Sequence, residues 1–187
     1  MWLARHSDDT AFLDHERLSE AQFSQQDVED VQKLRELAVV TKIMGHNTPR
    51  EQVVFSRSGK TYKFGGAPKT RPGFPAVLQK LANMYFEEAD IAVVNFYRGN
   101  TDSIAWHTDA ERNIDPEKVV SFSFGAERRF QMRAIANKRE KQEVIIKDRD
   151  VYTMRGTFQE YFEHCVPKEK EVNNDMRINV TFRALRS

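Results

Sequence analysis

The chain contains one cysteine, no long apolar run and almost no net charge. Because a disulfide needs two cysteines, the lone Cys165 excludes an internal disulfide and fits a reducing compartment. No stretch reaches the roughly 20 apolar residues that a membrane-spanning helix requires, and the first residues lack the apolar core of a signal peptide. We therefore expect a soluble intracellular protein, cytoplasmic or nuclear, without membrane contact.

The sequence also lacks low-complexity segments and internal repeats. Its 187 residues, 40% of them hydrophobic, suit one domain (1–187) with a substantial core. The net charge of +1 conceals an asymmetry, because residues 1–36 carry nine acids against four bases. This acidic end is a poor face for nucleic acid. We assign residues 1–45 to an N-terminal extension that contains a helix.

Two segments far apart in the chain carry metal-binding residue types: His107 and Asp109 flank Thr108, and His164 follows much later. Side chains at i and i+2 of a strand point to the same face, so a strand at or beside residues 107–109 would let both reach one ion. Two imidazoles and one carboxylate suit iron(II) or manganese(II) and leave positions open for substrate chemistry. The alternative interpretation is a surface loop pair, because His-x-Asp also occurs by chance.

The C-terminal segment 177–183 alternates with the period of a strand. One face is apolar, and the other carries Arg177, Asn179, Thr181 and Arg183. The two arginines could bind opposite ends of a small dicarboxylate. A solvated face of an outer strand is the alternative. The first interpretation is favoured because a metal triad of this kind needs an anionic co-substrate.

From about residue 45 to the C-terminus, the chain resembles the AlkB-type iron(II) and 2-oxoglutarate dioxygenases. One departure is Arg149, which precedes Asp150 where many relatives have glycine. The segments that carry the resemblance occur in the family's order and spacing. They are Asn95-Phe96-Tyr97-Arg98, 102–111 (DSIAWHTDAE), 121–130 (SFSFGAERRF), Met154-Arg155-Gly156, His164-Cys165-Val166-Pro167-Lys168 and 177–183.

The resemblance implies a role for each matching residue. His107, Asp109 and His164 would be the catalytic iron(II) ligands. Arg177 would bind the distal carboxylate of 2-oxoglutarate, and Arg183 would lie near the carboxylate that binds iron. Further contacts to the same co-substrate would come from Asn95, Tyr97 and Asn179.

The resemblance also implies an activity, the oxidative N-demethylation of 1-methyladenine or 3-methylcytosine in DNA or RNA. With O2, 2-oxoglutarate would become succinate and carbon dioxide, and the methyl group would leave as formaldehyde, which is direct reversal of alkylation damage. Glu111 matches the acidic position that contacts the damaged base. A carboxylate there can accept from the exocyclic amino group of adenine or cytosine.

A basic and aromatic segment predicts how the nucleic acid is bound. Within residues 46–75, which we interpret as a nucleotide-recognition lid, the stretch from 56 to 71 has five cations and no acid. Cations suit phosphates and aromatic rings suit base stacking. We expect single-stranded DNA or RNA as the partner of a monomeric protein, with contacts from Arg57, Tyr62, Lys63 and Phe64. A solvated hairpin is the alternative.

The periodicities predict an all-β core with flanking helices. Helices are expected over 25–38, with Leu34 and Leu37 on the apolar side, and from Pro75 onward. Seven short strands follow, and many strands after early helices suggest a double-stranded β-helix, or jelly roll, over 90–187, with the helices buttressing one sheet. Trp106 and Cys165 are expected in the core. The predicted strands are 91–97, 119–124, 129–133, 144–147, 151–154, 161–166 and 177–183.

Three functional interpretations remain from the sequence. The first is nucleic-acid N-demethylation, and the second is the same oxygenase chemistry on a protein or small-molecule substrate. Glu111 and the basic, aromatic lid favour the first. The third, a nucleic-acid-binding module without activity, would predict a broken triad or a lost arginine, and the sequence has neither.

Overall fold

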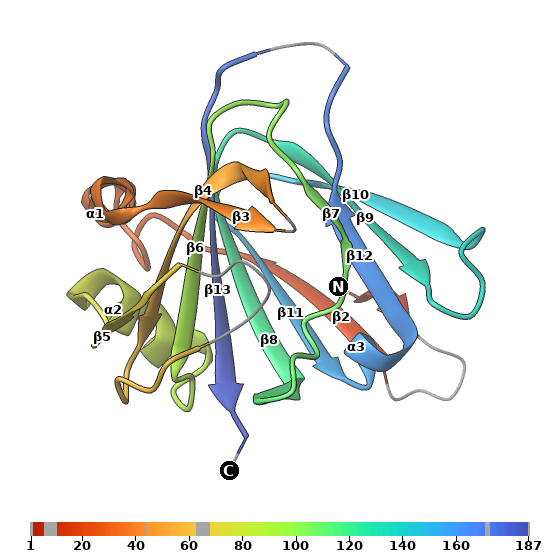
Figure 1. Ribbon diagram of the computed structural model, residues 1–187, viewed down its shortest axis with the longest axis horizontal. Helices are drawn as coiled ribbons and strands as arrows, with labels where there is room; N and C mark the ends of the chain where they lie inside the picture. Colours follow the sequence, from red (N-terminus) through yellow and green to blue (C-terminus); the bar gives the residue numbers. More distant parts are fainter. Residues whose placement is uncertain (1, 6–10, 44, 63–67, 171–172, 187) are drawn as a thin grey trace.

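The computed structural model describes residues 2–5, 11–43, 45–62, 68–170 and 173–186. These residues form two packed β-sheets with a few short helices (Figure 1). In the described part of the chain, the major sheet has nine strands in the order β1-β2-β11-β8-β13-β6-β4-β3, with β5 paired to β4. Its strands are β1 (Trp2–Arg5), β2 (Ala11–Arg17), β3 (Val39–Ile43), β4 (His46–Ser56), β5 (Thr70–Pro72), β6 (Ile91–Tyr97), β8 (Ile114–Gly125), β11 (Asp150–Gly156) and β13 (Arg177–Leu185).

The minor sheet packs against one face of the major sheet. Its order is β10-β9-β12-β7, so β7 forms one edge. The helices α1 and α2 lie on the opposite face of the major sheet (Figure 1). The bounds are β7 (Ile104–His107), β9 (Arg128–Ala134), β10 (Lys141–Ile146), β12 (Phe162–Val166), α1 (Gln25–Lys33), the 3-10 helix η1 (Leu34–Leu37), α2 (Ala76–Tyr85) and α3 (Phe158–Tyr161).

Local sequence explains where the two buttressing helices begin. Ser24 caps α1 by accepting from the Asp27 N–H, and the Asp27 carboxylate accepts in turn from the Ser24 N–H. Pro75 is the N-cap of α2, directly before the first helical residue. The predicted helix over 25–38 is interrupted, because α1 ends at Lys33 and continues as η1. This tighter turn rotates Leu37 outward to 38% exposure, so its predicted place on the buried side is wrong.

Successive side chains of β13 and β6 point to opposite faces of the major sheet, so each strand contributes to both faces. Ile178, Val180 and Phe182 pack with the helices in one hydrophobic cluster. The other face of β13 carries its arginines toward the minor sheet, where Tyr97 joins a second cluster. Polar side chains are therefore held between two sheets, in a space partly shielded from water.

The predicted jelly-roll core with buttressing helices is confirmed by this arrangement. Strand β6 has the predicted bounds, and β13 begins at the predicted residue. The sheet extends beyond 90–187, however, because β2 pairs with β11 and β4 pairs with β6. No helix among the described residues has the length and apolar character needed to cross a bilayer.

Arg149 occupies the turn between β10 and β11. Its φ of 65° lies in the left-handed region that favours glycine, the residue that the family resemblance predicts at this position. The Arg149 N–H donates to the Ser123 carbonyl at 2.8 Å, and its own carbonyl accepts from the Leu18 N–H at 2.9 Å. These bonds hold the turn despite the less favourable residue.

Candidate active site

Three side chains with metal-binding atoms converge between the sheets. His107 ends β7 and lies directly opposite His164 of β12 in the antiparallel register. His164 Nε2 lies 3.5 Å from Asp109 Oδ2, and His107 Nε2 lies 3.9 Å from Asp109 Oδ1. The candidate ligand atoms all lie within 4.8 Å of one another. One divalent ion could contact all three.

Asp109 lies in the loop after β7, beyond the last residue of the strand. The pleat of a strand therefore does not hold it in place. Instead, Arg183 Nη2 donates to Asp109 Oδ1 at 2.5 Å, and the Asp109 N–H donates to Gln159 Oε1 at 2.8 Å. Sequence reasoning missed Gln159, because a lone glutamine on the four-residue helix α3 carries no local signal.

The charges of the triad suit metal binding. Burial alone would raise the pKa of Asp109, but the Arg183 guanidinium and His164 hold it well below its ordinary value, so Asp109 is ionised. Burial and the nearby His164 ring lower the pKa of His107 to about 4, so His107 is neutral near pH 7. His107 Nδ1 lies 2.9 Å from the Ala105 carbonyl. Because a carbonyl only accepts, Nδ1 carries the hydrogen and Nε2 keeps a lone pair for a metal.

A small cavity of about 60 Å³ adjoins the triad on the side of β13. Arg177 is buried there, and its Nε donates to Ser123 Oγ at 2.9 Å. Among the described residues, Nη1 of Arg177 and both Nε and Nη1 of Arg183 are buried without a hydrogen-bond partner. Unpaired buried donors on cations are costly, and carboxylate groups would satisfy them. The donor set therefore fits an anionic co-substrate beside a metal ion.

The other predicted co-substrate residues line the same cavity. Tyr97 lies under the Arg177 guanidinium, whose carbon is 5.1 Å from the ring centre. Asn179 Nδ2 donates to Ser121 Oγ at 2.6 Å, while its Oδ1 accepts from Thr181 and, at 3.5 Å, from Asn95 Nδ2. The structure thus brings all five predicted residues together, and their contacts with 2-oxoglutarate stay a prediction.

A second, larger cavity of about 660 Å³ meets the first at His107 and Asp109. Glu111 lines it, and Oε2 of its carboxylate is buried in the wall. Tyr62 is also in the lining, and burial together with the negative charge of Glu111 raises the pKa of its phenol. The cavity wall therefore offers a neutral phenol near a carboxylate acceptor.

The comparisons with known proteins agree with this geometry. A sequence profile of the 2OG-Fe(II) oxygenase superfamily matches residues 5–183. The chain belongs to this superfamily. Its members take iron(II) and 2-oxoglutarate, as the name states, and the predicted cofactor and co-substrate are supported by the donor set described above.

Two curated relatives confirm the resemblance to the AlkB type within the superfamily. The alpha-ketoglutarate-dependent dioxygenase alkB homolog 3 of Homo sapiens is 29% identical over 157 residues, which cover 73% of this chain and 54% of that protein. The DNA oxidative demethylase ALKBH2 of Mus musculus is 29% identical over 152 residues, covering 75% of this chain and 63% of that protein. The chain thus spans about half the length of the first relative.

Solved structures of the superfamily share the fold. OsALKBH1 matches with a TM-score of 0.63 at 16% identity, covering 90% of this chain and 97% of that chain. An oxidoreductase of the 2OG-Fe(II) oxygenase family from Burkholderia pseudomallei matches with a TM-score of 0.58 at 14% identity, covering 94% of this chain and 88% of that chain. At these identities the likeness supports the fold alone.

The predicted lid residues divide into three groups. Tyr62 reaches the larger cavity. Arg57 does not line it, because its Nη1 donates to the Glu87 carbonyl and its guanidinium lies over the Phe74 ring at 5.1 Å. Lys63 and Phe64 lie outside the described residues. The role of 46–75 as a lid of this oxygenase stays a prediction.

Trp106 and Cys165 line the larger cavity, on the outer side of the minor sheet. The expected core position of Trp106 is wrong, because β7 is an edge strand and Trp106 faces the cavity instead of a packed core. Trp106 is half-buried under Arg133, whose guanidinium carbon lies 4.0 Å from the ring centre. Cys165 is buried as expected, and burial raises its pKa to about 11.

Proposed function

We propose that this protein demethylates N-alkylated bases of DNA or RNA by oxidation, with 2-oxoglutarate converted to succinate and carbon dioxide. The observation that carries the proposal is the meeting of two cavities at the triad. One offers the unsatisfied guanidinium groups of Arg177 and Arg183 to a dicarboxylate. The other offers the carboxylate of Glu111 to a substrate.

The triad and the two arginines of the smaller cavity each have a definite task in this proposal. His107, Asp109 and His164 hold iron(II), which, when bound with 2-oxoglutarate and O2, supplies the oxidising power that hydroxylates the methyl group. Arg177 binds the distal carboxylate, and Arg183 keeps Asp109 ionised while facing the carboxylate nearest the metal. Burial between the sheets limits the access of water.

The residues of the larger cavity recognise the base. The Glu111 carboxylate accepts from an exocyclic amino group, which 1-methyladenine and 3-methylcytosine both have. Held in this way, the N-methyl group faces the triad, and the N-hydroxymethyl product loses formaldehyde to leave the unmodified base. A base must leave its stack to enter such a cavity, which favours a single-stranded substrate.

A nucleic-acid substrate is supported by two curated relatives, from Mus musculus and Arabidopsis thaliana, that are named DNA oxidative demethylase. The exposed Lys168 at the cavity wall supplies positive charge for a phosphate. The alternative, a protein or small-molecule substrate, is not favoured by the relatives. We propose that the protein acts as a monomer on one strand.

The test is a coupled assay of repair and succinate formation. The protein is loaded anaerobically with iron(II) and 2-oxoglutarate, and O2 is then added with a single-stranded oligonucleotide that carries one 3-methylcytosine. Mass spectrometry follows the loss of the methyl group and the appearance of succinate. An unmethylated oligonucleotide and the Asp109→Asn variant serve as controls.

We expect repair and succinate in equal amounts, both absent with Asp109→Asn. Succinate without repair would contradict the nucleic-acid substrate and favour the alternative. Formation of neither product by correctly loaded protein would contradict the oxygenase assignment. Glu111→Gln provides a further check, because replacing one acceptor oxygen with an NH2 group should lower kcat/KM for 3-methylcytosine by about tenfold.

A further inference from the structure

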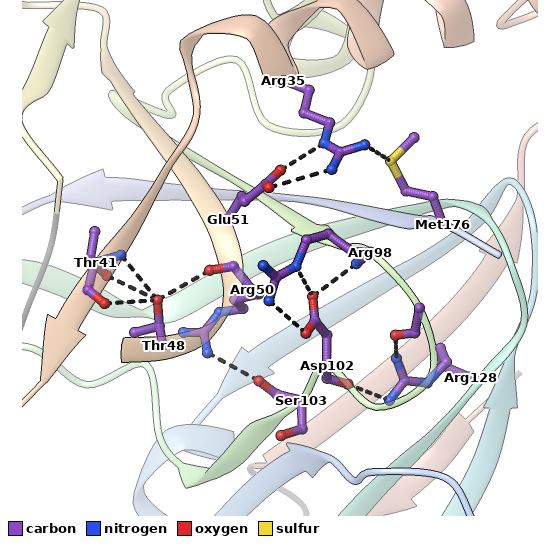
Figure 2. Close-up of polar contacts among 11 residues, drawn as sticks. Arg35, Thr41, Thr48, Arg50, Glu51, Arg98, Asp102, Ser103, Arg128 and Met176 are labelled. Atoms are coloured by element: carbon purple, nitrogen blue, oxygen red, sulfur yellow. Dashed lines mark hydrogen bonds and ion pairs between the residues drawn. The ribbon is translucent and has the colours of Figure 1, made fainter. Parts of the chain in front are cut away.

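Arg50 of β4 is a buried cation that contacts Asn95, a residue that lines both cavities. It is 6% exposed and lines the larger cavity. Its Nε donates to Asn95 Oδ1 at 3.0 Å, and its Nη1 donates to the Ser103 carbonyl at 3.2 Å. In the described part of the chain, no ion pair joins it to a carboxylate within 4.0 Å. Figure 2 shows the bond from Arg50 to Ser103.

The contact with Arg50 determines the orientation of the Asn95 amide. A guanidinium only donates hydrogen bonds, so the Asn95 atom that faces Arg50 must be the carbonyl oxygen. Gln52, two residues along the same strand, donates its Nε2 to the same oxygen at 2.7 Å. The NH2 group of Asn95 is therefore directed toward Asn179 Oδ1 and the small cavity, which Asn95 also lines.

We propose that Arg50 is a positioning residue, which together with Gln52 holds the Asn95 amide so that its NH2 group faces 2-oxoglutarate. This inference rests on the proposed function. Arg50 does not touch the co-substrate cavity, and it acts through Asn95. Its second bond, to Ser103, reaches the residue directly before β7, the strand that ends at His107. One side chain thus connects the co-substrate contact with the segment that carries a metal ligand.

Neighbouring arginines show how different the environment of Arg50 is. On the opposite side of β4, Arg35 Nε pairs with Glu51 Oε2 at 2.6 Å (Figure 2). Arg98 pairs with Asp102 at 2.8 Å. In both pairs a carboxylate balances the charge of the arginine, so an ion pair accounts for the presence of that arginine. Arg50 instead has amide and carbonyl oxygens as partners, which balance less charge but fix an orientation.

A double-mutant cycle tests the inference. Isothermal titration calorimetry gives the Kd of 2-oxoglutarate for manganese(II)-loaded protein, which binds without turning over. The variants are Arg50→Met, Asn95→Ala and the double variant. If Arg50 acts through Asn95, Arg50→Met should raise the Kd about tenfold in the native background and less than about twofold beside Asn95→Ala. The matched control is Arg35→Met, which should leave the Kd unchanged.

A second variant keeps the test valid if Arg50→Met does not fold, which circular dichroism would show. Gln52→Leu removes the other donor to Asn95 without removing a charge, and should raise the Kd about threefold, again only when Asn95 is present. Equal effects in both backgrounds, or no effect, would overturn the inference. If the native protein itself does not bind 2-oxoglutarate, the proposed function fails, so the two failures are distinguishable.

Discussion

The two cavities that meet at His107 and Asp109 have differently built walls. Apart from Asp109, the lining of the small cavity comes from strands, among them β6, β12 and β13. The larger cavity takes much of its lining from loops and from the edge strand β7, including Tyr62, Glu111 and Lys168. Strand pairing fixes backbone positions on both sides of a residue, whereas loops tolerate change.

This difference assigns separate tasks to the two regions. The chemistry shared by a superfamily needs its groups held to within a fraction of an ångström. Paired strands hold His164 and the two arginines of β13, while hydrogen bonds from Arg183 and to Gln159 hold Asp109 in its loop. Substrate choice varies among members, and loops can vary without disturbing the sheets. We therefore expect substitutions in the small cavity to affect every substrate equally, and substitutions in the larger cavity to affect nucleic-acid binding.

Replacement of Asp109, where the cavities meet, should have the largest effect. Asp109→Ala removes one metal ligand and should lower demethylation more than about 100-fold, with oligonucleotide binding largely unchanged. Loss of one partner of a buried ion pair also costs roughly 3–5 kcal/mol, so the melting temperature is measured alongside. The matched control is Glu163→Ala, on the outer face of the minor sheet. Unimpaired demethylation by the Asp109 variant would refute the metal assignment.

Removal of a buried cation from the small cavity comes next. Arg177→Met should raise the Kd of 2-oxoglutarate about 100-fold, because the distal carboxylate loses a buried, charge-assisted partner. Calorimetry on manganese(II)-loaded protein measures this, and oligonucleotide binding should not change. Arg129→Met is the control, since Arg129 pairs with Glu169 and lines neither cavity. An unchanged Kd would mean that the co-substrate binds elsewhere.

A charge reversal at the wall of the larger cavity should have a smaller effect that depends on salt. Lys168→Glu should weaken binding of a single-stranded oligonucleotide about fivefold at low salt and reduce the slope of log K against log salt by about one. Fluorescence anisotropy measures both quantities. Lys147→Glu, whose lysine pairs with Glu127 outside the cavity, is the control. Equal effects of the two variants would argue against a phosphate contact at Lys168.

The smallest effect is expected at Cys165, which lines the larger cavity without a proposed task. Cys165→Ala should change kcat less than about twofold. Because burial raises the pKa of the thiol to about 11, little thiolate is present near neutral pH, and alkylation by iodoacetamide should be slow. The rate should continue to rise with pH toward that value. Fast labelling near pH 7 would show that the Cys165 thiol is more accessible and has a lower pKa than its burial indicates.

Local patterns predict the strands that carry most of the co-substrate residues. From Arg177 to Ala184, polar and apolar residues alternate in β13, and β6 is a short run of mostly apolar residues, so the sequence alone indicates both strands. The predictions for Leu37 and Trp106 are wrong for reasons of context. The exposure of Leu37 depends on where the α-helix α1 changes to the 3-10 helix η1, and the exposure of Trp106 depends on whether another layer covers β7.

The polar positions of β4 also have a pattern that is visible in the sequence. Arg50 and Gln52 stand at i and i+2 just before an apolar run, a spacing that places both side chains on one face of a strand, but Glu51 between them is polar too, so the apolar alternation of β13 is missing. Gln159 has no comparable pattern, because α3 is too short to have a periodicity. A residue that acts by one hydrogen bond to a distant backbone leaves no local signature.

By itself, the sequence determined the kinds of groups available: two histidines and a carboxylate for a metal, two arginines on one strand face for an anion, and an acid two residues beyond Asp109. Only the tertiary structure decided that His164 lies opposite His107, that Arg183 holds Asp109 ionised, and that Arg50 orients Asn95. The physical reason is that strand register and hydrogen bonds between distant segments depend on how the whole chain packs, whereas residue type and alternation are local properties.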